Sequence, residues 1–321
     1  MMLFASLLAS GIQSALEPAG MQADRIGRLW NLFLGVSVVV WVLVMLFLVA
    51  ALLRRRPEII PNSTSPRVRM AVSIATGLTV LTLFGLLTAS IFTSRSIADV
   101  PDRAIQIAVI GRQWWWQVEY DDVDKSKRFV TANELTIPVG VPVTLHLRST
   151  DVIHSFWVPN LHGKRDLIPG KPATTLTLRA DRPGVYRGQC AEFCGYQHAN
   201  MSFWVTAVPM AEYARWVDAS RMPSKAPSTP KQRKGQEVFM NSPCPLCHTI
   251  QGTPANGKTA PDLTHFASRR SIAAGTVPNR RGFLGGWILD AQHIKPGSQM
   301  PSMTLEQGEL EPLIDYLESL R

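Results

Sequence analysis

Four potential metal ligands lie close together in one short segment of this chain. Two cysteines, a histidine and a methionine follow the order C-x3-C-x3-H-x2-M; they are Cys190, Cys194, His198 and Met201. Thiolate, imidazole and thioether groups are ligands that suit copper. The C-x3-C spacing is wider than the C-x-x-C turn of structural zinc sites, and methionine is not among the usual zinc ligands. The segment therefore predicts a copper site.

The copper site needs a further imidazole from elsewhere in the chain. His154 lies in a strand-like segment upstream and is the natural candidate. Nearby glycines, Gly195 among them, allow the loop to fold tightly enough for both sulfurs to face one centre. The alternative is a disulfide between Cys190 and Cys194, which would leave the histidine and methionine as ordinary surface and core residues.

A second cluster of reactive residues opens the C-terminal part of the chain. Cys244, Cys247 and His248 form a C-x-x-C-H motif, which is the attachment motif of a c-type haem. The two sulfurs would form thioethers with the porphyrin, and His248 would become the proximal iron ligand. A thioredoxin-like redox dithiol is the alternative, but it needs a βαβ context and leaves His248 unexplained. The motif therefore predicts a covalent haem.

The second iron ligand is expected from a loop near the C-terminus. Met300 lies in the segment 295–301, which resembles the distal-methionine loop of cytochromes c. It precedes a proline, as the distal ligand does in those proteins, and is preferred to Met303 for that reason. Methionine opposite histidine raises the iron potential. His265 and His293 are alternative distal ligands that no motif supports.

Two apolar runs near the N-terminus are long enough to cross a bilayer. Leu29–Leu53 and Met70–Thr93 carry no charge, and about 20 apolar residues suffice for a transmembrane helix. The short loop between them is basic, with Arg54, Arg55, Arg56, Arg67 and Arg69. Such a loop is expected to face the cytoplasm, which places both termini outside. The net charge of +9 is therefore explained by topology rather than by a nucleic-acid surface.

The rest of the chain divides into modules by composition. Alternating apolar segments separated by Pro-Gly turns predict an antiparallel sandwich or barrel after the second span. A Pro-, Ser- and Lys-rich stretch then predicts an exposed linker. The expected domains are a leader or N-terminal segment at 1–23, a transmembrane hairpin at 24–96, a β-domain at 97–209, a linker at 210–234 and a C-terminal module at 235–321.

The two ends of the chain raise separate questions. The first residues could form a signal peptide ending near Ala15, and the sequence leaves its cleavage open. Residues 304–320 have apolar positions at helical spacing and predict a terminal amphipathic helix. Thr304 and Gln307 would form its capping box. All four cysteines lie in the two ligand clusters, so none remains for a disulfide framework.

Both clusters and an aromatic segment resemble cytochrome c oxidase subunit II of the caa type, in which a cytochrome c domain is fused after the copper domain. The aromatic segment is Gly111–Tyr120, where the family's usual Gly-His-Gln-Trp-Tyr-Trp is altered at Arg112 and Trp115. The resemblance covers nearly the whole chain. It implies a two-helix transmembrane hairpin, a cupredoxin-like antiparallel β-sandwich and an all-α cytochrome c domain.

The resemblance implies a binuclear copper A centre. Its ligands would be His154, Cys190, Glu192, Cys194, His198 and Met201. The two cysteines would each bridge both coppers. His154 with Met201 would complete one copper, and His198 with the backbone carbonyl of Glu192 would complete the other. In the family, the carboxylate at the position of Glu192 also binds magnesium at the border with subunit I.

The aromatic segment would carry the electron entry. The first tryptophan of the motif is the family's electron-entry residue, and it corresponds to Trp114. Because side chains alternate along a strand, Trp114 and Trp116 are expected on one face. We expect Trp116 to pack in the sandwich and Trp114 to lie at the surface beside the copper. His146 and His162 have no motif and are expected to be structural or surface residues.

The function implied by the resemblance is an electron relay in a proton-pumping oxidase. A soluble cytochrome c or similar donor would reduce the haem, and the electron would pass through the copper pair to oxygen chemistry in subunit I. Further oxidase subunits and lipid are expected partners, with both soluble domains outside a bacterial cytoplasmic membrane. The second span has no acidic residue, so the family's proton-path role is not carried over.

Two other classes of function stay open. Nitric oxide reductases can also carry a copper A subunit, and the partner gene or gas-uptake assays would separate the two. A non-enzymatic copper store or chaperone would release a single copper reversibly, whereas a relay would hold a copper pair tightly. A quinol-oxidising subunit II is disfavoured because such subunits lack the copper ligands present here.

Overall fold

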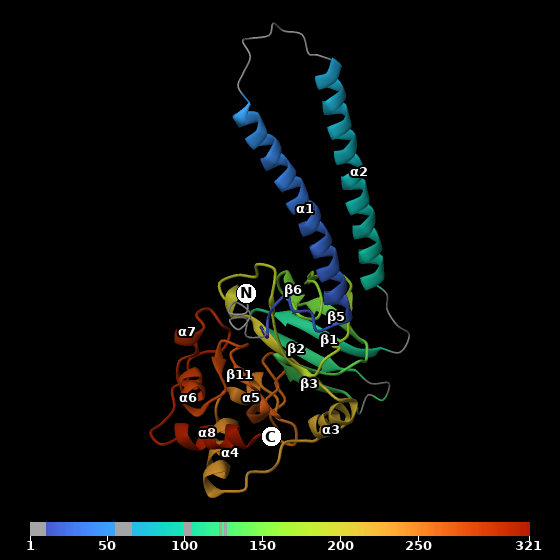
Figure 1. Cartoon of the computed structure of the whole chain (residues 1–321). Coiled ribbons are helices and arrows are strands. Elements are labelled where there is room, and N and C mark those ends of the chain that lie inside the picture. The colour runs from blue at the N-terminus through green and yellow to red at the C-terminus, as the bar shows by residue number, and fades with distance from the viewer. Residues whose placement is uncertain (1–10, 55–65, 99–103, 122–123, 125–126) are drawn as a thin grey trace, which may run out of the picture. The chain divides into compact units, whose positions relative to one another are not determined.

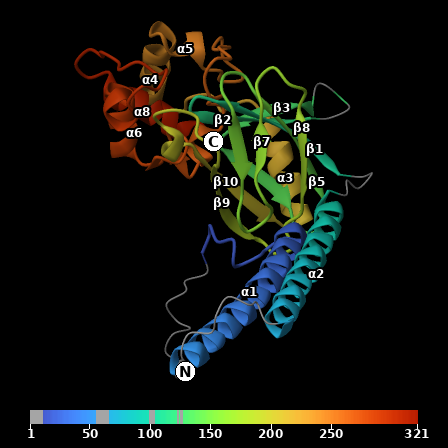
Figure 2. The ribbon, with the colours of Figure 1, turned by 90° about the horizontal axis from the view of Figure 1, so that it is seen from above.

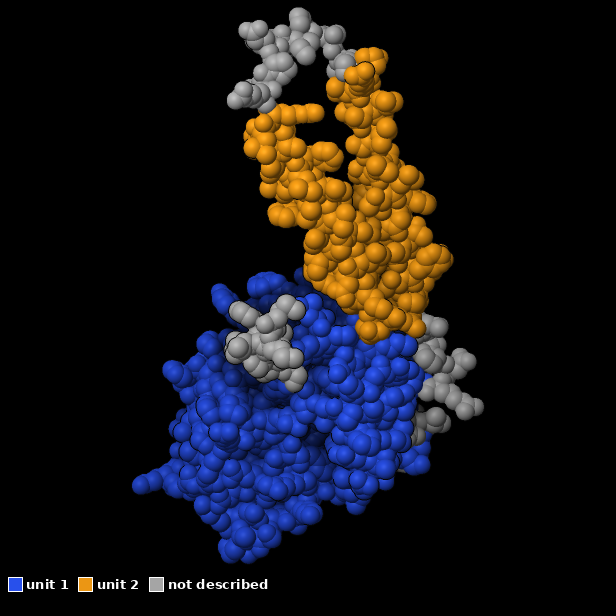
Figure 3. Space-filling view, in the orientation of Figure 1, with its two compact units in different colours: residues 1–23, 100–321 blue, residues 24–99 orange. Residues whose placement is uncertain are grey.

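The structure is a computed structural model that describes residues 11–54, 66–98, 104–121, 124 and 127–321. It divides into two compact units (Figure 3). One unit is Asp24–Asp99, and the other contains Met1–Ala23 and Val100–Arg321. Residues 1–10 of the expected leader, and the loop arginines Arg55 and Arg56, lie outside the described residues.

The smaller unit is a pair of long apolar helices. They are α1 (Met21–Leu53) and α2 (Pro66–Ile97), and they contain both predicted spans. Each is long and apolar enough to cross a membrane. Their side chains are mostly exposed, including Trp41 and Phe84, and a helix that is apolar on all sides needs lipid or protein around it. The predicted two-helix hairpin is confirmed by these elements.

The larger unit begins with a β-sandwich (Figures 1 and 2). Its strands are β1 (Ile105–Arg112), β2 (Trp115–Tyr120), β3 (Phe129–Ala132), β4 (Glu134–Pro138), β5 (Val143–Ser149), β6 (His154–Trp157), β7 (Arg165–Leu167), β8 (Thr174–Leu178), β9 (Gly184–Cys190) and β10 (Ser202–Val208). They form two five-stranded sheets, in the orders β3-β2-β1-β5-β8 and β4-β10-β9-β6-β7.

Strand direction in the sandwich departs from the sequence prediction in one pair of each sheet. Most neighbours are antiparallel, as expected, but β1 runs parallel to β5 and β4 runs parallel to β10. Polar–apolar alternation reports which face of a strand is buried, but it carries no information about the direction of the neighbouring strand. The predicted sandwich is therefore confirmed, with these two parallel pairs added to it.

The aromatic core between the sheets supports one predicted metal ligand. Trp116 is 1% exposed and makes edge contacts with the rings of Phe156, Phe203 and His154. The Phe203 ring fills the space above Gly188, where a Cβ atom would lie 2.1 Å from it. The expectation that Trp116 packs in the core is confirmed. The core thus holds the imidazole of His154 in a rigid apolar setting.

Residues 11–20, which directly precede α1, form hydrogen bonds with the sandwich. The Ala19 N–H donates to the Asn160 carbonyl at 2.7 Å, and the Arg187 N–H donates to the Ile12 carbonyl at 2.7 Å. The Asp181 N–H donates to the carbonyl of Ala19 at 2.8 Å. Residues near the proposed cleavage point at Ala15 therefore hydrogen-bond with the β-domain.

The C-terminal domain is mainly helical and packs beside the sandwich in the same unit (Figures 1 and 2). It follows α3 (Met210–Arg221) and contains α4 (Pro230–Asn241), α5 (Cys244–Cys247), η3 (Phe266–Ser268), α6 (Arg281–Leu289), α7 (Ala291–Ile294), α8 (Leu310–Ser319) and a hairpin of β11 (Ser271–Ile272) and β12 (Val277–Pro278). A separate apolar core, which includes Phe239 and Tyr316, holds these helices together.

Two helix starts differ from the sequence prediction. The first helix of the C-terminal module starts at Pro230, upstream of the expected module boundary at 235. Thr229 and Gln232 form its capping box, which the Pro-, Ser- and Lys-rich composition of this stretch did not indicate. The last helix starts at Leu310, so the capping box proposed for Thr304 and Gln307 is wrong. Gly308 has φ +86, a left-handed conformation that interrupts a helix begun at Thr304.

The contact between α4 and α8 provides a test of the C-terminal packing. A Cβ atom on Gly235 would lie 1.9 Å from the Pro312 carbonyl oxygen, so Gly235→Ala must push the two helices apart. We expect a loss of about 1–3 kcal/mol in unfolding free energy. Gly282→Ala in α6 is the matched control, because nothing lies within 4 Å of its added Cβ. Thermal unfolding followed by circular dichroism measures both, and equal midpoints for the two variants would contradict the packing.

Candidate metal centres

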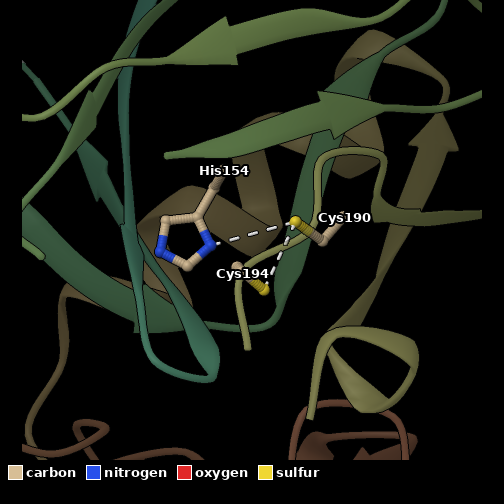
Figure 4. Close-up of side chains that lie close together, drawn as sticks. All are labelled: His154, Cys190 and Cys194. Carbon is tan, nitrogen blue, oxygen red and sulfur yellow. Dashed lines mark hydrogen bonds between the residues drawn. The ribbon is translucent and has the colours of Figure 1, made fainter. Parts of the chain in front are cut away.

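Three buried side chains meet beside the end of β9 (Figure 4). The Cys190 Sγ atom lies 3.8 Å from Nδ1 of His154 and 3.8 Å from Sγ of Cys194. Both cysteines are free thiols, since a disulfide would need about 2.05 Å between the sulfurs. Ligand atoms at about 2.3 Å from one tetrahedral metal lie roughly 3.7 Å apart. The observed distances between these ligand atoms therefore fit atoms that bind one metal together.

The sandwich delivers these side chains from two neighbouring strands. Cys190 is the last residue of β9, and β6 starts with His154 and pairs with β9 so that Phe156 lies opposite Cys190. Gly111 on β1 leaves room for the imidazole, because a Cβ atom there would lie 2.8 Å from Cδ2 of His154. Gly195 has φ +107 and turns the ligand loop directly after Cys194.

A carboxylate orients the imidazole of His154. Oδ1 of Asp151 lies 2.8 Å from Nε2 of His154, which leaves Nδ1 to face Cys190. Burial lowers the pKa of His154, but the hydrogen bonds to Asp151 and Cys190 outweigh it and raise the pKa overall. Asp151 also accepts hydrogen bonds from the backbone N–H groups of Val152 and Gln113. A carboxylate behind a histidine is the usual arrangement at metal sites.

The hydrogen bond between the two thiols favours loss of the proton from Cys190 and disfavours its loss from Cys194. Hydrogen bonding to Cys194 lowers the pKa of Cys190 to about 3, with help from His154. The same bond raises the pKa of Cys194, because two adjacent thiolates repel each other in a buried site. A cation bound between the sulfurs would remove this repulsion and allow both thiols to ionise.

The remaining expected ligands lie around the same two sulfurs. Sγ of Cys194 is 3.6 Å from Nδ1 of His198 and 3.9 Å from Sδ of Met201. On the other side, Sγ of Cys190 is 3.2 Å from the carbonyl oxygen of Glu192. The structure thus brings together every copper ligand expected from the sequence. This soft set of two sulfurs, two imidazoles, a thioether and a carbonyl fits copper.

The carboxylate of Glu192 and the side chains of two predicted histidines make other contacts. The carboxylate of Glu192, which was expected to bind magnesium, forms an ion pair with Lys164 at 3.3 Å. Nε2 of His146 lies 2.7 Å from Oε1 of Gln106. His162 is 7% exposed, and burial lowers its pKa to about 4. The two histidines therefore have structural settings, as the absence of a motif indicated.

The second predicted site opens into a cavity of about 250 Å³ in the C-terminal domain. The cysteine–histidine motif and both candidate methionines line it: Cys244, Cys247, His248, Met300 and Met303. Neither His265 nor His293 is among its lining residues, and Nε2 of His265 instead lies 3.0 Å from the Met222 carbonyl. The structure therefore favours a methionine over either histidine as the second iron ligand.

The surroundings of the cavity suit a haem. Nδ1 of His248 lies 2.7 Å from the carbonyl oxygen of Pro261, so it must donate, and Nε2 is left free for iron. Burial lowers the pKa of His248, which keeps the imidazole neutral as ligation requires. Arg269 also lines the cavity, and its buried Nε has no hydrogen-bond partner among the described residues. An anionic propionate group would satisfy that donor.

Trp114 lies between the two sites. It sits in the turn before β2 rather than on the strand, so the expected alternation with Trp116 does not include it. Its Nε1 donates to the Cys194 carbonyl at 2.8 Å, and the residue also lines the haem cavity. The residue lies beside the copper ligands as predicted, but it is half-buried instead of lying at an open surface.

One residue at this junction carried no signal in the sequence. Lys295 is 2% exposed, and its ammonium donates to the backbone carbonyls of Trp114, Asn200 and Ala273. Burial lowers the pKa of Lys295 and nearby Cys194 raises it, and the three carbonyls, which accept from the ammonium, favour the charged form. The residues next to a lysine in the sequence do not reveal that its side chain becomes buried when the chain folds.

Comparisons with known proteins point to one family. The family described as "Cytochrome C oxidase subunit II, periplasmic domain" matches residues 105–208, and that described as "Cytochrome c" matches residues 232–321. Cytochrome c oxidase subunit 2 of Alkalihalophilus pseudofirmus is 34% identical, over 96% of this chain and 91% of its own length. The protein of the same name from Bacillus sp. (strain PS3) is 30% identical, over 77% of this chain and 73% of its own length.

A solved structure is similar to part of the chain. The periplasmic domain of subunit II of cytochrome oxidase (CoxB) of Bradyrhizobium japonicum is 29% identical over 38% of this chain and 97% of its own, with a TM-score of 0.36.

Asp151→Asn tests the support behind His154. The substitution keeps the size of the side chain but removes the charge that orients the imidazole. We expect copper affinity to fall by about 10–100-fold, measured by competition with a chelator on the metal-free chain. Asp181→Asn is the control, because Asp181 pairs with Arg179 outside the site. Equal affinities for the two variants would show that Asp151 does not support the ligand.

The burial of His162 predicts a pH dependence of stability. Its folded pKa of about 4 lies below the ordinary 6.5, so the unfolded chain takes up a proton that the folded chain lacks. The unfolding free energy should therefore fall as the pH decreases from 6.5 to 4, by roughly 3 kcal/mol from this residue. Urea unfolding should show that His162→Gln removes this part of the slope and that His146→Gln does not. An unchanged slope in His162→Gln would contradict the assignment.

Proposed function

Because the chain belongs to the cytochrome c oxidase subunit II family, we propose that it is the electron-entry subunit of a caa-type haem–copper oxidase. It relays electrons from a soluble cytochrome c or a similar donor, through a covalent haem and a binuclear copper A centre, to the oxygen-reducing subunit I. The observation that carries this proposal is the pair of ligand sets on one chain, with Trp114 donating to the Cys194 carbonyl and lining the haem cavity.

The fold of the chain positions the ligand side chains of both sites. A copper pair and a haem, when bound, supply centres that gain and lose single electrons. His154, Cys190, Cys194 and Met201 are buried, so they exclude water and hold their donor atoms with little freedom to move. A copper pair held by Cys190 and Cys194 would share one electron over two metals and two thiolates, so each bond would change little and the nuclear rearrangement on electron transfer would be small.

The haem site would be held by a second set of residues. Cys244 and Cys247 would form the thioethers with the haem, His248 would bind the iron through Nε2, and Met300 would be the second iron ligand. The carbonyl of Pro261 fixes the imidazole tautomer. Met300 stays the proposed ligand over Met303, because it precedes Pro301 as the distal methionine does in cytochromes c.

Localisation and partners follow from the helices and the family. The two apolar helices anchor the chain in a bacterial cytoplasmic membrane, with the copper and haem domains on the outer side and the basic loop inside. Support for the outer placement comes from the match of residues 105–208 to a periplasmic domain family. Subunit I, further oxidase subunits and lipid are the expected partners, and Glu192 is the proposed contact to a shared magnesium.

Reciprocal ligand variants test the two cofactors independently. In the purified chain, visible spectra should show a c-type haem, and electron paramagnetic resonance should show hyperfine lines from one electron shared by two copper nuclei. Cys190→Ser should remove the copper signal and leave the haem band. Cys244→Ala with Cys247→Ala should remove covalent haem and leave the copper signal.

Two results would contradict the proposal. A signal from a single copper nucleus, or copper that is released reversibly as one ion per chain, would indicate a copper store. Reduction of nitric oxide rather than oxygen by the purified complex in gas-uptake assays would assign the chain to a reductase.

A further inference from the structure

Lys295 joins the haem domain to the copper domain through a buried charge. It follows α7, and its Nζ donates at 2.8 Å to the carbonyl of Trp114 and at 2.6 Å to that of Asn200, both in the copper domain. The third donor hydrogen reaches the Ala273 carbonyl, at 2.9 Å, within its own domain. A lysine ammonium has three hydrogens to donate, so this carbonyl trio satisfies it completely.

The loop that supplies Ala273 also contacts the copper domain. The β11–β12 loop holds Ala273 at φ 54 and Ala274 at φ 56, a left-handed conformation that costs energy in residues other than glycine. This conformation turns the Ala274 carbonyl toward Ser202 on β10, which donates from its backbone N–H at 3.0 Å and from Oγ at 3.2 Å. The strained loop is therefore held in place by the contact between the domains.

A carboxylate of the copper domain makes the reciprocal contact. Oε1 of Glu134 on β4 accepts the backbone N–H of Arg270 at 2.6 Å, beside the start of β11. Trp204 on β10 donates from Nε1 to Oγ of Ser271 at 2.9 Å. Each domain thus places one charged side chain against backbone groups of the other. Together these hydrogen bonds define one relative position of the two domains.

Trp114 is held where these contacts meet. Lys295 binds its backbone carbonyl, while the indole Nε1 binds the Cys194 carbonyl at 2.8 Å. Gly297, in the loop that continues to Met300, faces the ring, since an added Cβ there would come within 3.7 Å of the indole. The ring therefore lies beside the proposed distal-ligand loop and donates to the backbone of a proposed copper ligand.

We propose that Lys295 is a positioning residue that fixes the haem domain on the copper domain, so that Trp114 bridges the haem cavity and Cys194. The inference rests on the proposed function, because it assumes that both cofactors are bound. Burying an ammonium is costly unless all of its hydrogens are bonded. A docking geometry that buried the ammonium away from these carbonyls would leave its hydrogens unpaired, so Lys295 selects the geometry more than it adds affinity.

Lys295→Met tests the role, because it keeps the length of the side chain and removes the ammonium. In the purified oxidase complex, a flash of light reduces the haem through a photosensitiser, and absorbance follows its reoxidation by the copper pair. We expect one fast phase in the unaltered complex. The variant should transfer electrons at least tenfold more slowly and in several phases, with unchanged haem and copper contents. Lys234→Met, at an exposed lysine of α4, is the control and should match the unaltered complex.

A double-mutant cycle separates positioning from general structure. Trp114→Phe alone should slow the transfer, and adding Lys295→Met should slow it no further, because both changes break the same bridge. Additive effects, or a single phase at the original rate in Lys295→Met, would overturn the proposal. Absence of haem-to-copper transfer in the unaltered, fully metallated complex would instead overturn the proposed function.

Discussion

Two hydrogen bonds that end on the carbonyl oxygen of Cys194 tie the structure together. The side-chain amide of Gln113 donates at 2.7 Å and the indole of Trp114 at 2.8 Å. They fasten the ligand loop to the turn between β1 and β2, so the proposed copper ligands cannot shift without that turn. Because the carbonyl of Trp114 in the same turn accepts a hydrogen bond from Lys295 of the C-terminal domain, the position of the haem cavity depends on these bonds as well.

The same hydrogen-bonding arrangement orients one histidine in each of the two proposed metal sites. In each, one imidazole nitrogen is occupied by an oxygen acceptor, so the other nitrogen faces the place of the metal. The acceptor is the carboxylate of Asp151 for His154 and the carbonyl of Pro261 for His248. Burial lowers the pKa of both histidines, but at His154 the hydrogen bonds to Asp151 and Cys190 outweigh it and raise the pKa, whereas the pKa of His248 stays lowered.

Local chemistry was predictable from the sequence, and contacts between distant segments were not. Spacing alone grouped Cys190, Cys194, His198 and Met201 as candidate ligands, and the structure brings their side chains together because residues on one short loop lie near one another. His154 was found by resemblance and by its strand. Lys295 was missed, since a buried lysine differs from an exposed one only by what surrounds it after folding. The start of α8 was misplaced because Gly308 adopts a left-handed conformation, which polar–apolar periodicity does not reveal.

We propose that the haem and copper domains form one rigid electron-transfer unit rather than two domains that move freely on a flexible linker. Pulsed electron paramagnetic resonance can measure the distance between the oxidised haem and the copper pair, since both carry unpaired electrons. We predict one narrow distance distribution that is the same at low and at high ionic strength, because the contacts around Lys295 and Ser202 are shielded from solvent. A broad distribution, or one that shifts with salt, would contradict the account.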